Sequence, residues 1–300
     1  MAFKSFLPAD SKRPKSQYLL PSKSTRSAYA IRENFSLSTW LLLGALIQSA
    51  IVFVIPRLYA FLPVFLVLAS RLADSLAITY GVKTNHYLDD AILGRVSPQI
   101  PDGDGKFSEN PSSEKVVVFM LGAKCNHPMG LFAPNFKEIG DTLNNMTKAL
   151  EKNSIDNGFY GGSMWTSQDK NGATEFLFLS YWRSTEDVHN FAYLPVHREA
   201  WDWWNATVKQ NDHLGINHEI FEVDRHHWEG VYLNFQPTLL GATTYLKKGD
   251  KLIGGTVDDE WISPLIDARK GKLRTSAGRL GHDPQQNAEK YGFDGYDGVQ

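Results

Sequence analysis

The stretch Thr174–Trp204, TEFLFLSYWRSTEDVHNFAYLPVHREAWDWW, joins an apolar segment to a tryptophan-rich segment that contains His197. Alternation along a strand divides the apolar side chains of 174–183 between two faces: Phe176, Phe178 and Trp182 on one, and Leu177, Leu179 and Tyr181 on the other. Because neither face suits contact with water, we expect this strand in a sheet that is covered on both sides. The oxygen-bearing and acidic side chains of 184–187 predict that a helix begins near Ser184.

The composition is that of a chain with a real hydrophobic core. The 300 residues are 42% hydrophobic and 21% charged, which allows one or two domains. Lys and Arg, 31 in number, are balanced by 33 Asp and Glu and are spread along the chain, so a nucleic-acid partner is not expected. Cys125 is the only cysteine, which excludes an intramolecular disulfide and a multi-cysteine metal site.

The first 80 residues predict a membrane anchor. Residues 1–33 carry seven basic and two acidic side chains without an apolar period, and we expect a loose, disordered basic arm. No charge appears from 34 to 56, a length that crosses a bilayer core of about 30 Å as a helix. The apolar run 58–70 follows between two arginines. We therefore expect a transmembrane helix or a helical hairpin over 34–80.

The number of crossings decides where the rest of the chain lies. The basic arm favours a cytoplasmic amino terminus, in the membrane of the endoplasmic reticulum. One crossing would then place the remainder in the lumen, and two would return it to the cytosol. A secretory signal is an alternative, but the apolar block begins late and lacks a clear cleavage site. A buried core helix of a soluble domain is a second alternative, but the long stretch without a charged residue argues against it.

The remaining chain is divided into a linker at 81–114, a domain at 115–248 and a partly disordered C-terminal extension at 249–300. Strands are expected at 116–121, 159–166, 174–183 and 216–223, with helices after the first and the third. The order β-α-β-β-α-β is the ferredoxin-like arrangement, an α+β fold. Helices cover one face of such a sheet, so the two-faced third strand predicts a homodimer or an internal second half. Further strands are expected at 228–235 and 241–246, and 97–115 has the composition of an exposed linker.

His197 is the main candidate for chemistry. After Pro195, which should interrupt the helix, His197, Trp201 and Trp204 recur at the spacing of one helical face. The imidazole therefore points inward among aromatic rings, either as a core residue bonded to the backbone or as a proton shuttle or haem contact. On the fourth strand His218 and Glu219 are adjacent and point to opposite faces, so one of them is expected to face the pocket.

Other site classes find little support. His213, His218, His226 and His227 have no HExxH or facial-triad spacing to a carboxylate, so we expect no metal site. The domain contains no GxGxxG after a strand, no GxxxxGK[ST] and no GxSxG, which argues against nucleotide binding and against a serine hydrolase.

Four segments carry a resemblance to a known family: YWRSTEDVHNFA at 181–192, PVHREAW at 195–201, GINHEIFEV at 215–223 and WEGVYLNFQPTLLG at 228–241. The chain from about Lys115 to Lys247 resembles fungal monooxygenases of the fumagillin-pathway kind, in the antibiotic-biosynthesis monooxygenase superfamily. The resemblance implies a dimeric α/β barrel that oxidises an apolar polyketide or terpenoid of secondary metabolism with dioxygen and without metal or flavin.

The resemblance also implies roles for individual residues. His197, His218 and Glu219 match polar positions of the family motif, so His197 is expected as acid/base catalyst and Glu219 or Asn126 as the group that orients substrate or oxygen. The expected substrate-binding wall comprises Trp165, Trp182, Trp201 and Trp204. Asn126, Trp182 and His197 also form a loose analogue of the Asn-Trp-His set of haem-degrading relatives, so a haem enzyme of the same fold is an alternative. A non-catalytic binding or scaffold protein is another.

Overall fold

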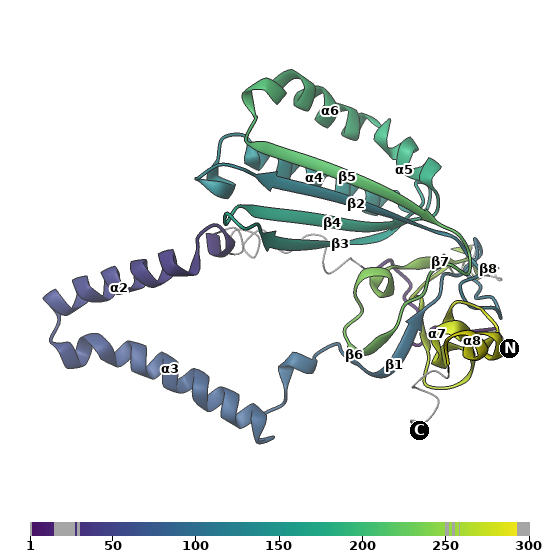
Figure 1. The fold of residues 1–300 in the computed structure, drawn as a ribbon, viewed down its shortest axis with the longest axis horizontal. Coiled ribbons are helices and arrows are strands. Elements are labelled where there is room, and N and C mark those ends of the chain that lie inside the picture. Colours follow the sequence, from purple (N-terminus) through teal and green to yellow (C-terminus); the bar gives the residue numbers. More distant parts are fainter. Residues whose placement is uncertain are drawn as a thin grey trace.

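The computed structural model describes residues 2–14, 28, 31–249, 252–253, 256–257 and 259–292. They form a sheet covered by helices, a hairpin of two long helices and a C-terminal body of short strands and helices (Figure 1). The predicted α+β class is confirmed, and the strands pair in antiparallel sheets.

The main sheet has four antiparallel strands in the order β3-β4-β2-β5. Their bounds are β2 (Val116–Cys125), β3 (Phe159–Gln168), β4 (Thr174–Trp182) and β5 (Leu214–Val223). Between them in the chain lie α4 (Phe136–Lys152), α5 (Thr185–Ala192) and α6 (Pro195–Thr207). The succession is therefore β-α-β-β-α-β, with the second helix divided in two.

Two local signals explain this divided helix. The side-chain oxygen of Ser184 accepts a 3.1 Å hydrogen bond from the N–H of Asp187 and caps α5, as the sequence predicts. Pro195 lies in the first turn of α6, where its missing N–H costs nothing, so the chain ends one helix and begins another.

Three helices cover one face of the sheet (Figure 1). Trp182 is 2% exposed and lies at the centre of this layer, with ring centroids 5.2 Å from Phe159 and 5.9 Å from Phe191. The other buried members of the layer are Val117, Leu150, Phe178 and Val188. Their removal from water holds the helices on the sheet.

The C-terminal body covers part of the opposite face. Tyr181 of β4 packs there with four buried side chains from later in the chain: Trp228, Leu240, Tyr245 and Ile262. The chain thus supplies an internal cover over one end of this face. Beyond the cover, Trp165 and Phe221 remain 49% and 48% exposed.

The expected exposed linker at 97–115 is wrong for residues 97–101, which are buried. Strand β1 (Ile92–Pro98) lies between β6 (Tyr232–Phe235) and β11 (Leu265–Asp267) in a three-stranded sheet. Ser97 and Gln99 are 0% and 3% exposed. Proline and glycine indicate turns, but the partner strands lie more than a hundred residues along the chain, where local composition cannot reveal them.

The expected strand 228–235 is present only in its second half, as β6, and the expected strand 241–246 is divided between η4 and β7. The remaining elements are η1 (His86–Leu88), η2 (Gly130–Phe132), η3 (Val208–Gln210), η4 (Leu239–Ala242), β7 (Tyr245–Lys247), β8 (Leu252–Ile253), β9 (Thr256–Val257), β10 (Glu260–Ile262), η5 (Gly271–Arg274), α7 (Ser276–Arg279) and α8 (Pro284–Tyr291).

Residues 2–14 of the expected loose arm pack on the C-terminal body. The N–H of Phe6 donates to the carbonyl of Leu265 at 2.6 Å, and Asp10 forms an antiparallel bridge with Trp261. For these residues the expectation of a disordered arm is wrong, because backbone hydrogen bonds to distant parts of the chain, which leave no periodic pattern in the sequence, hold them. Residues 15–27 and 29–30 of the arm lie outside the described residues.

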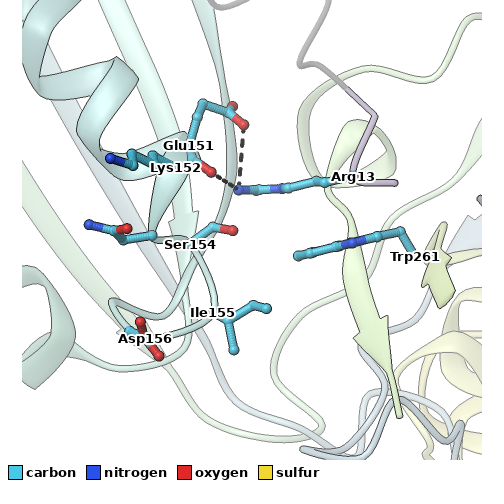
Figure 2. A pocket seen from close by; sticks show the side chains of 8 residues that line it. Arg13, Glu151, Lys152, Ser154, Ile155, Asp156 and Trp261 are labelled. Carbon is cyan, nitrogen blue, oxygen red and sulfur yellow. Dashed lines mark hydrogen bonds and ion pairs between the residues drawn. The ribbon is translucent and has the colours of Figure 1, made fainter. Parts of the chain in front are cut away.

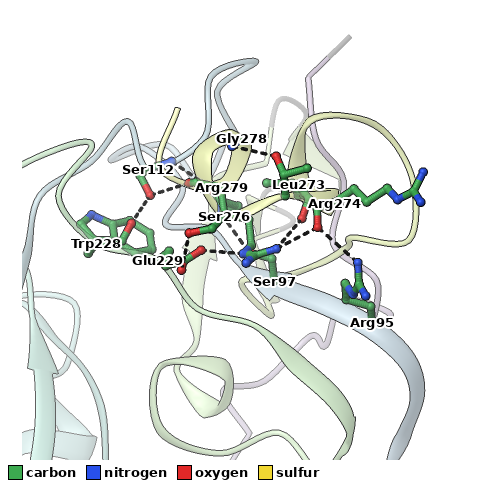
Figure 3. A network of polar contacts seen from close by, with 12 residues as sticks. Arg95, Ser97, Ser112, Trp228, Glu229, Leu273, Arg274, Ser276, Gly278 and Arg279 are labelled. Atoms are coloured by element: carbon green, nitrogen blue, oxygen red, sulfur yellow. Dashed lines mark hydrogen bonds and ion pairs between the residues drawn. The ribbon is translucent and has the colours of Figure 1, made fainter. Parts of the chain in front are cut away.

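A buried polar network fixes the end of α7 in the C-terminal body (Figure 3). The Arg279 side chain is 4% exposed, and its Nε donates to Oε2 of Glu229 at 2.7 Å. Its Nη1 donates to the carbonyl oxygens of Leu273 and Arg274 at 3.2 and 3.0 Å. One guanidinium therefore connects α7 with η5 and with the loop before β6.

Helices α2 (Leu37–Val54) and α3 (Arg57–Thr79) form the hairpin, which extends away from the rest of the protein (Figure 1). Within the described part of the chain they are the two helices long and apolar enough to cross a membrane, and their apolar spans are not buried in the protein. The predicted helical segment at 34–80 is therefore present as two helices.

Candidate active site

His197 lies on α6 with its ring between two aromatic side chains. The ring is edge-on to Phe191 and Trp201, at centroid distances of 6.1 and 6.3 Å. The residue is partly exposed, but its Nδ1 is buried without a hydrogen-bond partner among the described residues. The backbone of Ala192 contacts this ring without the geometry of a regular hydrogen bond, so the ring keeps hydrogen-bonding capacity for a bound molecule.

The surroundings of His197 favour its neutral form. Burial lowers the pKa of this imidazole, the backbone of Ala192 acts in the opposite direction, and the nearby His218 lowers the pKa further. An imidazole that stays neutral near pH 7 can accept a proton from a bound molecule.

His218 reaches the same side of the sheet from β5. Its ring lies 5.8 Å from that of Phe119, centroid to centroid, and its Cα pairs with that of Leu121. His218 is exposed, and Ile216, on the same face of β5, is 46% exposed. Helix α6 therefore leaves this part of the strand uncovered.

The accessible surface formed by His197, Trp201, Ile216 and His218 is here called the α6–β5 strip. It is less enclosed than the sequence predicts: α6 has no fully buried residue, and Trp201 is 46% exposed. The strip presents two imidazoles within an apolar border, which suits an apolar molecule that carries an acidic proton.

The other two tryptophans expected on this side are packed into the core. Trp182 donates from Nε1 to the hydroxyl of Ser180 at 2.9 Å and is fully buried, so it supports the site from beneath. Trp204 packs against a cluster that includes Cys125 and Phe136. Trp201 is thus the tryptophan of this group that a bound molecule reaches directly.

Two predicted site residues lie on the opposite face of the sheet. Trp165 pairs with Leu177, whose side chain points away from the helices. Glu219 alternates with His218 and therefore also points away from His197. The structure does not bring either residue to the α6–β5 strip.

Asn126 lies at a third position, just after the end of β2. Its N–H donates to the carbonyl of His213 at 2.7 Å. It follows Leu121, the partner of His218, by five residues, which is about 17 Å at the rise of a strand. Asn126 and His197 are therefore not brought together.

A site that the sequence does not indicate surrounds Arg13 (Figure 2). Its guanidinium lies over the rings of Phe159 and Trp261, 5.6 and 5.3 Å from their centroids. Its Nη1 lies 3.4 Å from the carboxylate of Glu151, and its Nη2 donates to the carbonyl of Tyr160 at 3.1 Å. Nothing in the sequence distinguishes Arg13 from the other basic residues of the arm.

The cavity beside Arg13 measures about 230 Å³. This is below the range of about 300–1,000 Å³ that is usual for ligand pockets. Burial lowers the pKa of Arg13 and raises the pKa of Glu151, while their attraction opposes both shifts. We interpret this cavity as a joint between the arm, the end of α4 and β10.

Among the described residues no group of three His, Cys, Asp or Glu side chains is placed to hold a metal ion. The rings of His127 and His213 lie 5.3 Å apart, but a lone pair of imidazoles does not complete a site.

Comparison with known proteins shows the family. The model of the af470-like monooxygenase family matches residues 116–240. Over 258 residues the chain is 31% identical to monooxygenase af470 of Aspergillus fumigatus, and the alignment covers 85% of this chain and 91% of that relative. The chain therefore belongs to the af470-like monooxygenase family and is an oxidoreductase of the monooxygenase type.

Solved structures resemble the chain more weakly. An aldoxime dehydratase in complex with butyraldoxime has a TM-score of 0.36 at 16% identity, covering 49% of this chain and 39% of its own. SnoaB, a cofactor-independent oxygenase from Streptomyces nogalater, has a TM-score of 0.25 at 13% identity, covering 35% of this chain and 90% of its own. A putative antibiotic biosynthesis monooxygenase from Deinococcus radiodurans has a TM-score of 0.25 at 14% identity, covering 36% of this chain and 93% of its own. The family assignment rests on the sequence comparisons.

Proposed function

We propose that the protein is a membrane-tethered monooxygenase that tailors an apolar polyketide or terpenoid on the α6–β5 strip. The observation that carries the proposal is His197: a half-buried imidazole with a lowered pKa, held between Phe191 and Trp201 and within electrostatic reach of His218. Family membership supplies the reaction class, and this geometry supplies a base beside an apolar surface.

The chemistry proposed needs an electron-rich substrate. His197 removes a proton from an acidic C–H or O–H group, and the resulting carbanion or phenolate reduces dioxygen. One oxygen atom enters the substrate and the other leaves as water, so that a CH₂ group and O₂ give a C=O group and H₂O. The substrate supplies all the electrons, and the aromatic side chains beside His197 offer it an apolar surface.

Dioxygen is therefore the proposed co-substrate, with no metal or flavin. In the haem alternative the protein would bind haem, which absorbs visible light strongly. The visible spectrum of the purified full-length protein separates the two: a Soret band would overturn the cofactor-free proposal in favour of the haem enzyme.

The proposed assembly is a homodimer. The face of the main sheet that carries Trp165 and Phe221 is only partly covered by the chain itself, and both side chains are about half exposed. Apolar side chains gathered on a sheet face are a common contact between subunits. A second copy is the proposed cover for this part of the sheet.

The central test is isotopic. An extract from cells that lack the gene should contain the accumulated substrate, and full-length protein in detergent with ¹⁸O₂ should convert it to a product that carries one ¹⁸O atom. The His197→Gln variant should lose this conversion, and the matched His189→Gln variant, an exposed histidine on α5, should retain it. No product with intact protein would favour the non-catalytic binding alternative, and product formation without oxygen uptake would overturn the proposed reaction with dioxygen.

A further inference from the structure

We propose that α2 and α3 cross a phospholipid bilayer twice, and that the protein meets the headgroups with an aromatic collar beside α2. The collar comprises Phe35, Trp40, Met129 and Phe132. This inference rests on the membrane tether of the proposed function and adds the number of crossings, the orientation and the surface in contact with lipid.

Contacts on both sides of the hairpin fix an even number of crossings. Before the hairpin, Phe6 bonds to Leu265 and Arg13 lies between Phe159 and Trp261. After it, the side chain of Gln236 donates to the carbonyl of Tyr87 at 3.2 Å. Because the same folded body holds the chain before α2 and after α3, a single crossing is geometrically excluded.

The charges of the hairpin favour two full crossings over an insertion into one leaflet. Helices of 18 and 23 residues reach about 27 and 34 Å, and the hydrocarbon core measures about 30 Å. Arg57 stands at the turn, where a charge suits water on the far side better than the bilayer centre. Arg71 and Asp74 lie in the last third of α3, within reach of the near headgroups.

Hydrogen bonds of Glu33 and Asn34, just before α2, form a joint that fixes this helix to the end of the main sheet. The amide of Asn34 donates to the carbonyl of Met129 at 3.2 Å and accepts from the N–H of Leu131 at 2.6 Å. The carbonyl of Glu33 accepts from the side chains of Gln168 and Thr174, at 2.7 and 3.2 Å. The orientation of α2 relative to the sheet is therefore set by the protein itself.

The collar lies directly beside this joint. The ring of Phe35 is 5.6 Å from that of Trp40 and 6.4 Å from that of Phe132, centroid to centroid. Met129 and Phe132 are 56% and 51% exposed, although they adjoin an apolar helix. At the end of α3, Tyr80 is 79% exposed. Aromatic side chains at the ends of membrane helices lie at the headgroup level, so these residues mark the near interface.

The sequence indicates which side the body occupies. Residues 1–33 carry seven basic and two acidic side chains, and the turn carries one basic residue, Arg57. Basic segments stay on the cytoplasmic side. Both termini and the α6–β5 strip are therefore assigned to the cytosol.

Cysteine labelling in sealed microsomes tests this topology. Cys125 is 0% exposed, so the native chain should react weakly with a membrane-impermeant maleimide. Full-length Lys4→Cys and Lys290→Cys should label without detergent, and Leu58→Cys, next to the turn, only after permeabilisation. Opposite labelling of the first two, or labelling of Leu58→Cys in sealed vesicles, would overturn the proposal, as would protein that carbonate washing removes from the microsomes.

A second measurement tests the collar. Met129→Cys and Ile155→Cys place a fluorophore before and after α4, a helix about 25 Å long, and the native residues are 56% and 53% exposed. In reconstituted vesicles, lipids with nitroxide-labelled headgroups should quench the label at 129 at least about fivefold more than the label at 155. Equal quenching would overturn the collar. Neither measurement involves turnover, so a failure of the oxygenase proposal and a failure of this topology are distinguishable.

Discussion

His197 combines a buried, unpaired Nδ1 with a ring that is otherwise reachable. Replacement of His197 by Gln should lower kcat/KM for oxygen-dependent product formation by about 10²–10⁴-fold, the usual contribution of a general base. Because burial lowers its pKa, the acidic limb of the wild-type pH profile should fall below about 6.5 and should be absent from the variant. An unchanged profile in His197→Gln would assign the residue to the core.

The lowered pKa of His197 also makes the stability of the folded protein depend on pH. The folded state binds a proton at His197 less readily than the unfolded state does, because burial disfavours the imidazolium. Stability is therefore highest at pH values above about 6.5 and should decline as the pH falls below it. Denaturant midpoints at pH 5.5 and 7.5 should differ less in His197→Gln than in the native protein or in His189→Gln.

Arg13 is predicted to stabilise the protein rather than to act on a ligand. In Arg13→Met the carboxylate of Glu151, whose side chain is 27% exposed, loses its partner. The cost should be about 2–3 kcal/mol, below the value for a fully buried pair because water reaches Glu151. Denaturant midpoints check this, with exposed Lys12→Met as the control. A gain of stability in the double variant Arg13→Met/Glu151→Leu over the single variant would identify the unpaired charge as the cause.

The sequence reveals some of these residues and not others. The helical spacing of His197 and Trp201 predicts a shared face, because neighbours on a helix are set by local geometry. The accessibility of that face depends on how far α6 lies from β5, which is a tertiary property. Arg13 escapes prediction for the same reason: its partners come from α4 and β10, far along the chain.

At the scale of single elements, the cap of α5 is the clearest test. Ser184→Ala removes the acceptor for the N–H of Asp187 and a 2.6 Å hydrogen bond to its carboxylate. The loss should be about 1 kcal/mol, measured by thermal unfolding, and Ser184→Thr should retain most of the stability. Equal losses in the two variants would contradict capping as the cause.

The network around Arg279 ties the last helices to the C-terminal body. Arg279→Met removes the donor to Oε2 of Glu229 and to the carbonyl of Leu273, at a cost of about 2–3 kcal/mol in this partly buried setting. The hydroxyl of Ser276 still donates to Oε1 of Glu229, and Arg95 still donates to the carbonyl of Arg274. Hydrogen exchange should increase at 271–282, and the main sheet should be unaffected. Exposed Lys270→Met is the control and should leave the exchange rates unchanged.

Elements of the main sheet are well predicted, because alternation and capping are local. The strand expected at 174–183 is found as Thr174–Trp182, and the helix expected after the first strand is α4. The C-terminal body is poorly predicted. Strands β1, β6 and β11 have 7, 4 and 3 residues of mixed polarity and show no clear period. Their pairing also joins distant parts of the chain.

For the whole molecule, self-association through the exposed sheet face is the expected result. Phe221→Lys places a charge among apolar side chains and should weaken the dimer at least about tenfold, corresponding to about 1.4 kcal/mol. Light scattering of the detergent-solubilised protein across a dilution series measures this change. Leu93→Lys is the control, since Leu93 is 63% exposed on β1, outside this face. A native protein that is monomeric at all concentrations would contradict the proposed assembly.

The docking of residues 2–14 on the C-terminal body changes how a water-soluble form of this enzyme must be engineered. Starting the polypeptide after Thr79 would delete Arg13 along with the apolar hairpin and leave Glu151 unpartnered. If a flexible linker replaces residues 37–79 and the first fourteen residues are kept, the ion pair of Arg13 with Glu151 is preserved. The proposed anchor is in this sense an insertion within the fold, and it can be removed only from the middle of the gene.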